Sequence, residues 1–91
     1  MPEITLVVRF PDGVVANCYS PSTVVREYFR AGETLPLTEF LRRSDQAFNH
    51  ASERVRAKYG FACSSALDQL DTILESSRRY PADSVIEIIS V

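Results

Sequence analysis

Large apolar residues occupy every second position at the start of the chain: Ile4, Leu6, Val8 and Phe10. This period of two predicts a β-strand with one buried face. Pro11-Asp12-Gly13 follows and suits a type I turn, because proline presets φ and glycine accepts the left-handed conformation. We therefore expect a β-hairpin at this end of the chain.

The length of the loop decides which residues of the hairpin face one another. A three-residue loop with a glycine bulge puts six facing residues of the two strands on one face, which favours this register over that of a two-residue loop. The predicted pairs are Phe10 with Val14, Val8 with Ala16, and Leu6 with Cys18.

The first of three predicted helices follows the hairpin. Ser20 as N-cap and Pro21 at the first helical position favour a helix start here, and Gly32 favours its end. Residues 33–37 are expected to form a loop. Thr38 then marks the start of a second helix.

Two longer helices are expected to pack together on the core. The second covers residues 39–59 before Gly60, and the third begins at residues 63–65 and ends before Pro81. Apolar residues recur in each at intervals of three or four, the spacing of a helix face that packs on a core. The stripe of the second helix contains Leu37, Leu41, Ser44, Phe48, Ala51 and Val55, and that of the third contains Ala66, Leu67, Leu70, Ile73 and Leu74.

Residues 85–91 predict a closing strand that turns Ile86 and Ile88 toward the core. The order of elements is ββαααβ, which indicates an α+β fold in a single domain spanning residues 1–91. We expect a three-stranded sheet with the last strand beside the first, and the helices packed on one face.

The other face of this sheet is predicted to stay bare and partly apolar. Arg9 and Glu87 are placed to form an ion pair there across neighbouring strands. An apolar patch of this kind is typical of an interface, so we expect this face, or the edge of the last strand, to mediate self-association. The interface candidates are Val7, Val15, Tyr19, Val85 and Ile89.

Composition and charge argue against several classes of protein. A net charge of −2 and a pI near 5.3 disfavour a dedicated nucleic-acid-binding protein. No apolar run approaches the roughly 20 residues of a membrane span, and the N-terminal segment lacks the pattern of a signal peptide, so we expect a cytoplasmic protein with no membrane partner. Two cysteines and one histidine are too few for a usual zinc site, and we expect no metal and no cofactor.

The stretch SERVRAKYGFACSSALDQL, residues 52–70, and the stretch CYSPS, residues 18–22, point to a family. Together with the first strand and the Pro-Asp-Gly turn, they make the chain similar to the small nitrogen starvation response proteins of bacteria. The likeness in size and order of elements covers nearly the whole chain. Genes of that family lie in clusters that also encode a nitrilase, so the resemblance implies a role in assimilating nitrogen from nitriles or cyanide. It implies no catalytic residues.

Cys63 is the candidate nucleophile, because it lies near the expected start of the third helix. The helix dipole and free N–H groups lower the pKa of a thiol in that position and favour the thiolate. The alternative is a small apolar side chain that fills space beneath the turn. No histidine or carboxylate pair is evident to complete a catalytic triad, which favours the packing role.

The turn at residues 59–65, between the second and third helices, is also a candidate anion site. The amides of Ser64 and Ser65, with the guanidinium groups of Arg54 and Arg56 on the preceding helix, have the chemistry of an anion cradle. Ordinary helix capping beside solvated arginines is the favoured alternative.

Three hypotheses about function therefore stay open. The leading one is a non-enzymatic accessory or interaction protein, which pairs with itself or with a protein from the same gene cluster. The second is a small-molecule or anion-binding module at residues 59–65, and the third is an enzyme that uses Cys63. No catalytic residues are assigned, and no nucleic-acid partner is expected.

Overall fold

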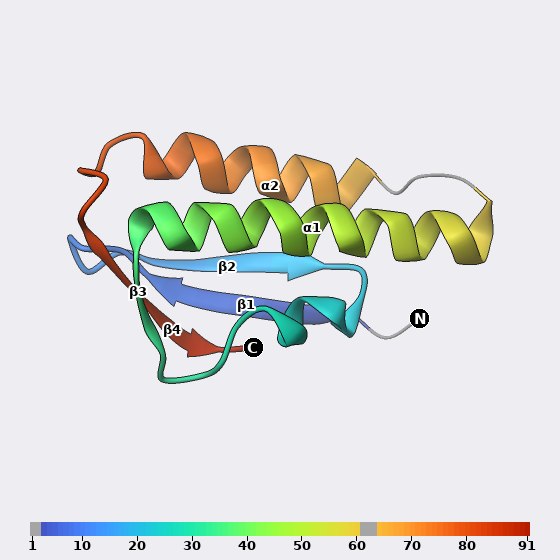
Figure 1. Cartoon of the computed structure of the whole chain (residues 1–91), viewed down its shortest axis with the longest axis horizontal. Coiled ribbons are helices and arrows are strands. Elements are labelled where there is room, and N and C mark those ends of the chain that lie inside the picture. The colour runs from blue at the N-terminus through green and yellow to red at the C-terminus, as the bar shows by residue number, and fades with distance from the viewer. Residues whose placement is uncertain (1–2, 61–63) are drawn as a thin grey trace.

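A four-stranded antiparallel sheet carries two helices on one of its faces (Figure 1). The computed structural model describes residues 3–60 and 64–91. The elements in chain order are β1 (Ile4–Arg9), β2 (Val15–Ser20), the 3₁₀ helix η1 (Thr23–Glu27), β3 (Thr34–Pro36), α1 (Leu37–Tyr59), α2 (Ser64–Ser77) and β4 (Val85–Ser90). The strand order is β2-β1-β4-β3. The predictions that the last strand lies beside the first and that the helices share one face are confirmed.

The hairpin of β1 and β2 has the predicted register. Leu6 lies opposite Cys18, and the N–H of Phe10 donates to the carbonyl of Val14 at 2.8 Å. Gly13 closes the loop with a φ of +90°, a left-handed conformation that glycine adopts without strain. Leu6, Val8 and Cys18 therefore share the face that the helices cover.

The helix expected after the hairpin is much shorter than predicted, and it begins later. Ser20 is the last residue of β2 and lies opposite Ile4, so it is not the N-cap. Its hydroxyl donates instead to the carbonyl of Ser22 at 2.7 Å. Ser22 is the N-cap, and its Oγ accepts the N–H of Val24 at 3.3 Å. Only η1, with five residues, follows before the chain continues to β3.

The segment assigned to a loop contains a fourth strand, so the prediction of a three-stranded sheet was wrong. Leu35 of β3 lies opposite Ile86 of β4, and the N–H of Ile88 donates to the carbonyl of Glu33 at 2.8 Å. Three residues that end in a proline are too few to show a period of two. Because β3 and β1 flank β4, the edge of β4 is covered at residues 85–88, which leaves little of it for the predicted self-association.

The helix α1 begins directly after β3 and spans the length of the molecule. Pro36 is its N-cap and makes no side-chain capping bond, so Thr38 is not the start that the sequence suggested. Gly60 ends the helix as predicted, with a φ of +82° and its N–H bonded to the carbonyl of Arg56 at 2.8 Å. The third predicted helix corresponds to α2.

The two helices bury nearly the stripes that their periodicity predicted. Phe48 and Ala51 of α1 and Ala66 of α2 have no exposed surface, and Leu70 and Ile73 are also buried. Leu67 was placed in the same stripe, but 38% of its surface is exposed. Helical residues are spaced 100° apart, which puts Leu67 about a quarter turn from the centre of the buried set, at the flank of the stripe.

Replacement of Phe48 by alanine is expected to lower the free energy of unfolding by about 3–5 kcal/mol, because it empties a fully buried site between α1 and the sheet. Leu67→Ala is the control in the same helical layer and should change the free energy of unfolding by about 0.5 kcal/mol or less. Urea unfolding followed by circular dichroism measures both. Equal losses in the two variants would contradict the described packing of the helices.

Candidate functional site

The side chains that point away from the helices form what we call the open face of the sheet. No helix or strand of residues 3–60 and 64–91 packs over it (Figure 1). Val15 is 51% exposed and Val85 is 55% exposed, while Val7 and Ile89 are half-buried. The residues of the open face include Val7, Arg9, Val15, Asn17, Tyr19, Val85, Glu87 and Ile89.

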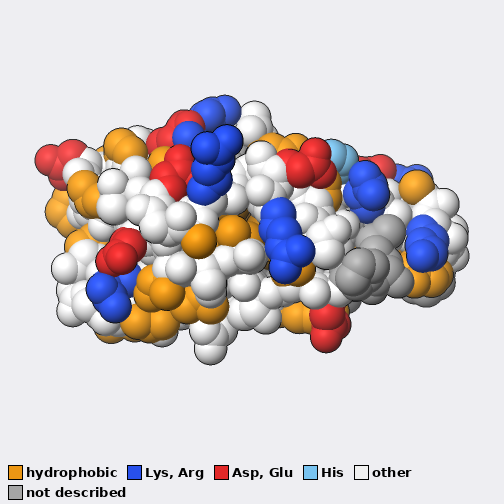
Figure 2. Space-filling model, turned by 90° about the horizontal axis from the view of Figure 1, so that it is seen from below, with side chains coloured by type: hydrophobic (Ala, Val, Ile, Leu, Met, Phe, Trp, Pro, Cys, Tyr) orange, Lys and Arg blue, Asp and Glu red, His pale blue; other side chains and the backbone are white. Residues whose placement is uncertain are grey.

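Charged side chains interrupt the apolar ones on the open face. Arg9 Nη1 lies 3.1 Å from Glu87 Oε1, which confirms the predicted cross-strand pair. Both side chains are about half exposed, so this pair contributes at most about 1 kcal/mol to stability. The hydroxyl of Tyr19 donates to Glu3 at 2.8 Å. Figure 2, seen from the strand side, shows hydrophobic side chains interspersed with basic and acidic ones.

The candidate anion site between the long helices is only partly described. Arg54 and Arg56 lie exposed near the end of α1, and Arg56 Nη1 is 3.8 Å from Glu53 Oε1. Cys63 and the side chains of Ser64 and Ser65 lie outside the described residues. The anion cradle and the nucleophilic role of Cys63 therefore stay predictions.

Cys18 is a packed core residue. Only 2% of its surface is exposed, and its side chain belongs to the hydrophobic core. Burial raises the pKa of its thiol to about 12, because the thiolate would lose its hydration. The neutral thiol is therefore the form favoured near neutral pH, which fits a packing role for Cys18.

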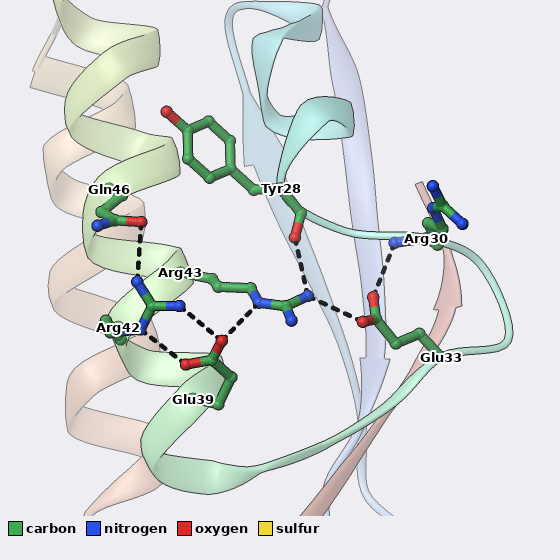
Figure 3. Close-up of polar contacts among 7 residues, drawn as sticks. All are labelled: Tyr28, Arg30, Glu33, Glu39, Arg42, Arg43 and Gln46. Atoms are coloured by element: carbon green, nitrogen blue, oxygen red, sulfur yellow. Dashed lines mark hydrogen bonds and ion pairs between the residues drawn. The ribbon is translucent and has the colours of Figure 1, made fainter.

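A network of side chains around Arg43 joins α1 to the segment between η1 and β3 (Figure 3). Its Nη1 donates to Glu33 Oε1 at 2.9 Å and to the carbonyl of Tyr28 at 3.3 Å. Its Nε donates to Glu39 Oε2 at 3.0 Å. Its hydrogen bond to Glu33, and to a smaller extent that to Glu39, raises the pKa of Arg43 above its usual value.

Two further contacts extend this network at both ends. Arg42 forms a two-point bond with Glu39, at 2.7 and 2.6 Å. The hydrogen bonds from Arg42, which have the larger effect, and from Arg43 lower the pKa of Glu39 to about 2. At the other end, the backbone N–H of Arg30 donates to Glu33 Oε2 at 3.2 Å. Both oxygens of each carboxylate are thus occupied.

An open cavity of about 550 Å³ lies beside the Arg43 network. Its lining is formed by Arg26, Glu27, Tyr28, Phe29, Arg30, Glu33 and Arg43. Nothing in the sequence pattern predicts this cavity. The spacing of Glu39 and Arg43 by four residues indicates their pairing on a helix, but nothing in the sequence shows that Glu33 reaches the same guanidinium.

The single histidine is held by a neighbouring tyrosine. The hydroxyl of Tyr28 and His50 Nδ1 lie 3.0 Å apart, and the two rings meet edge to face.

Within the described ranges, no group of three or more potential metal-binding side chains is found. None of the helices described there combines the length and apolar character needed to cross a bilayer.

The comparison with known families matches residues 5–91 to the family described as nitrogen starvation-induced protein NitG. The chain belongs to the NitG family. This match confirms the resemblance to nitrogen starvation response proteins over nearly the whole chain. No curated protein and no solved structure matches the chain significantly. The NitG family name states when the protein is induced, and the site geometry has to indicate how it acts.

In a Cys63→Ser variant, Cys18 is the sole thiol, and we expect iodoacetamide to alkylate it far more slowly in the folded protein than in urea. The cause is its burial together with its raised pKa. Mass spectrometry of timed samples at pH 8 measures the two rates. Equal rates in buffer and in urea would show that the thiol is accessible in the native state.

Proposed function

We propose that this protein is a non-enzymatic accessory protein of a nitrilase-linked pathway that assimilates nitrogen from nitriles or cyanide in the cytoplasm during nitrogen starvation. It acts by binding another protein of that pathway through the open face of its sheet. The exposure of Val15 and Val85, two β-branched residues on separate strands of one face, carries the proposal.

The energetics of this face favour burial by a partner. Transfer of apolar surface from water to an interface contributes about 25 cal/mol per Å². The Arg9–Glu87 pair lies between Val15 and Val85, and it offers a donor and an acceptor for orientation of the partner. Apolar anchors around a polar pair are common in interfaces that form between separately folded proteins.

Replacement of Val85 by glutamate is expected to weaken binding to a nitrilase encoded in the same gene cluster by at least tenfold, because it places an unpaired charge in the contact. Isothermal titration calorimetry with the purified nitrilase measures the affinity. Leu67→Glu is the matched control, since it adds the same charge at an exposed apolar position on α2, away from the open face. A nitrilase that does not bind the wild-type protein, or that binds all three proteins equally, would contradict the proposal.

A second candidate function, the binding of a small anion, rests on the cavity beside Arg43. Glu33 in its lining is fully engaged by Arg43 and by the backbone of Arg30. The side chains of Arg26 and Arg30 are exposed and form no ion pair within the part of the chain that the structure describes. Their guanidinium groups have the planar donor pattern that suits a carboxylate or phosphate.

Inorganic phosphate is the probe for this second function. We expect millimolar phosphate to raise the melting temperature of the wild-type protein, and the rise to be lost in the double variant Arg26→Gln/Arg30→Gln. The double variant Arg54→Gln/Arg56→Gln removes the same charge elsewhere and should retain it. The reverse result would instead support the anion site at residues 59–65, and no rise in the wild type would contradict both sites.

A further inference from the structure

The two edges of the sheet differ in how they are protected against pairing with another strand. β3, at one edge, has only three residues and ends in Pro36, which has no N–H to donate. β2, at the other edge, has six residues with the sequence VANCYS. It contains no proline and no charged residue, and its ladder with β1 has no bulge. Proline, charged side chains and β-bulges are the usual features that prevent an edge strand from pairing, and β2 has none of the three.

The register of the hairpin shows which backbone groups of β2 point outward. In an antiparallel ladder, residues that bond to the neighbouring strand alternate with residues whose N–H and C=O groups point away from it. Phe10 donates to the carbonyl of Val14, so the even-numbered residues of β2 bond to β1. Val15, Asn17 and Tyr19 therefore direct their backbone groups to the outer edge.

The helix α2 satisfies only one end of this edge. Gln69 Oε1 accepts the N–H of Tyr19 at 3.2 Å, which confirms the outward direction of these groups. The N–H groups of Val15 and Asn17 donate no hydrogen bond within residues 3–60 and 64–91. A short stretch of unpaired strand edge thus lies beside the exposed side chain of Val15.

We propose that β2 pairs antiparallel with β2 of a second copy of this chain about a two-fold axis, which joins the two sheets into one. Val15 of each copy lies opposite Asn17 of the other, and each such pair exchanges two backbone hydrogen bonds. This register uses the backbone groups left free by α2 and leaves the bond between Tyr19 and Gln69 in place. A two-fold axis makes the contact closed, so pairing stops at the dimer.

A second copy is the occupant that the composition of β2 favours. Two-fold pairing places identical strands side by side, and it is opposed when the strand carries charge, because like charges then meet. β2 carries none. Val15, which is 51% exposed in the single chain, lies diagonally across the axis from Val15 of the second copy, so the dimer buries apolar surface as well. The inference shares Val15 with the open face of the proposed function, but the contact it describes is made by the backbone edge of β2.

The test is the mass of the protein in solution, measured by sedimentation equilibrium across a concentration series. The wild-type chain of 10.2 kDa is expected to form a dimer of twice that mass. Asn17→Pro removes an outward N–H that the hairpin does not use, so we expect a folded monomer. Asn17→Ala is the matched control, because it keeps the N–H and should remain dimeric. Val15→Lys places a charge beside the axis and should also give a monomer.

Each outcome decides the matter. A wild-type protein that stays monomeric at high micromolar concentration overturns the inference. A dimer that survives both Asn17→Pro and Val15→Lys, or that is lost in Asn17→Ala, also overturns it, because the contact then does not use the backbone edge of β2. A dimer that Val85→Glu dissociates and Asn17→Pro does not would place self-association on the open face instead. Val15→Lys covers the case in which the proline variant fails to fold.

Discussion

Two helices cannot cover both faces of a four-stranded sheet, and this limit shapes the rest of the molecule. Successive side chains of a strand point to opposite faces, so burying Leu6 and Val8 of β1 beside Ile86 and Ile88 of β4 turns their neighbours outward. Both helices pack on that one face. The open face and the free edge of β2 are therefore consequences of a short chain that builds a complete core on one side only.

Arg43 holds the irregular segment between η1 and β3 against α1. Its guanidinium bonds to a backbone carbonyl and to two carboxylates from separate segments. The side chains of Arg43, Glu33 and Glu39 are each between 25% and 29% exposed, so water screens these pairs less than it screens Arg9 and Glu87. The fixed position of this segment in turn gives β3 its place beside β4 and shapes the cavity.

Periodicity predicted the elements in which apolar residues recur at regular intervals. It missed those that form only through pairing with residues far away in the sequence. The hairpin register, α1 and its end at Gly60 follow from local pattern and turn chemistry. β3 does not, because three residues become a strand only where β4 offers its backbone groups. Ser20 satisfied a capping rule, yet pairing with Ile4 kept it in β2. Among candidate residues, the Arg9–Glu87 pair and the exposure of Val15 and Val85 were readable from alternation. The cavity beside Arg43 was not, because its lining comes together only through the fold.

The length of α1 has a consequence for how the molecule opens. Its 23 residues span about 34 Å, whereas a six-residue strand spans about 20 Å. The last turns of α1 extend past the strands in Figure 1, and residues 56–60 are all exposed. These turns can fray without uncovering Phe40 or Phe48, so local opening there requires less free energy than global unfolding. The last turns of α1 are therefore the part of this helix that opens most readily.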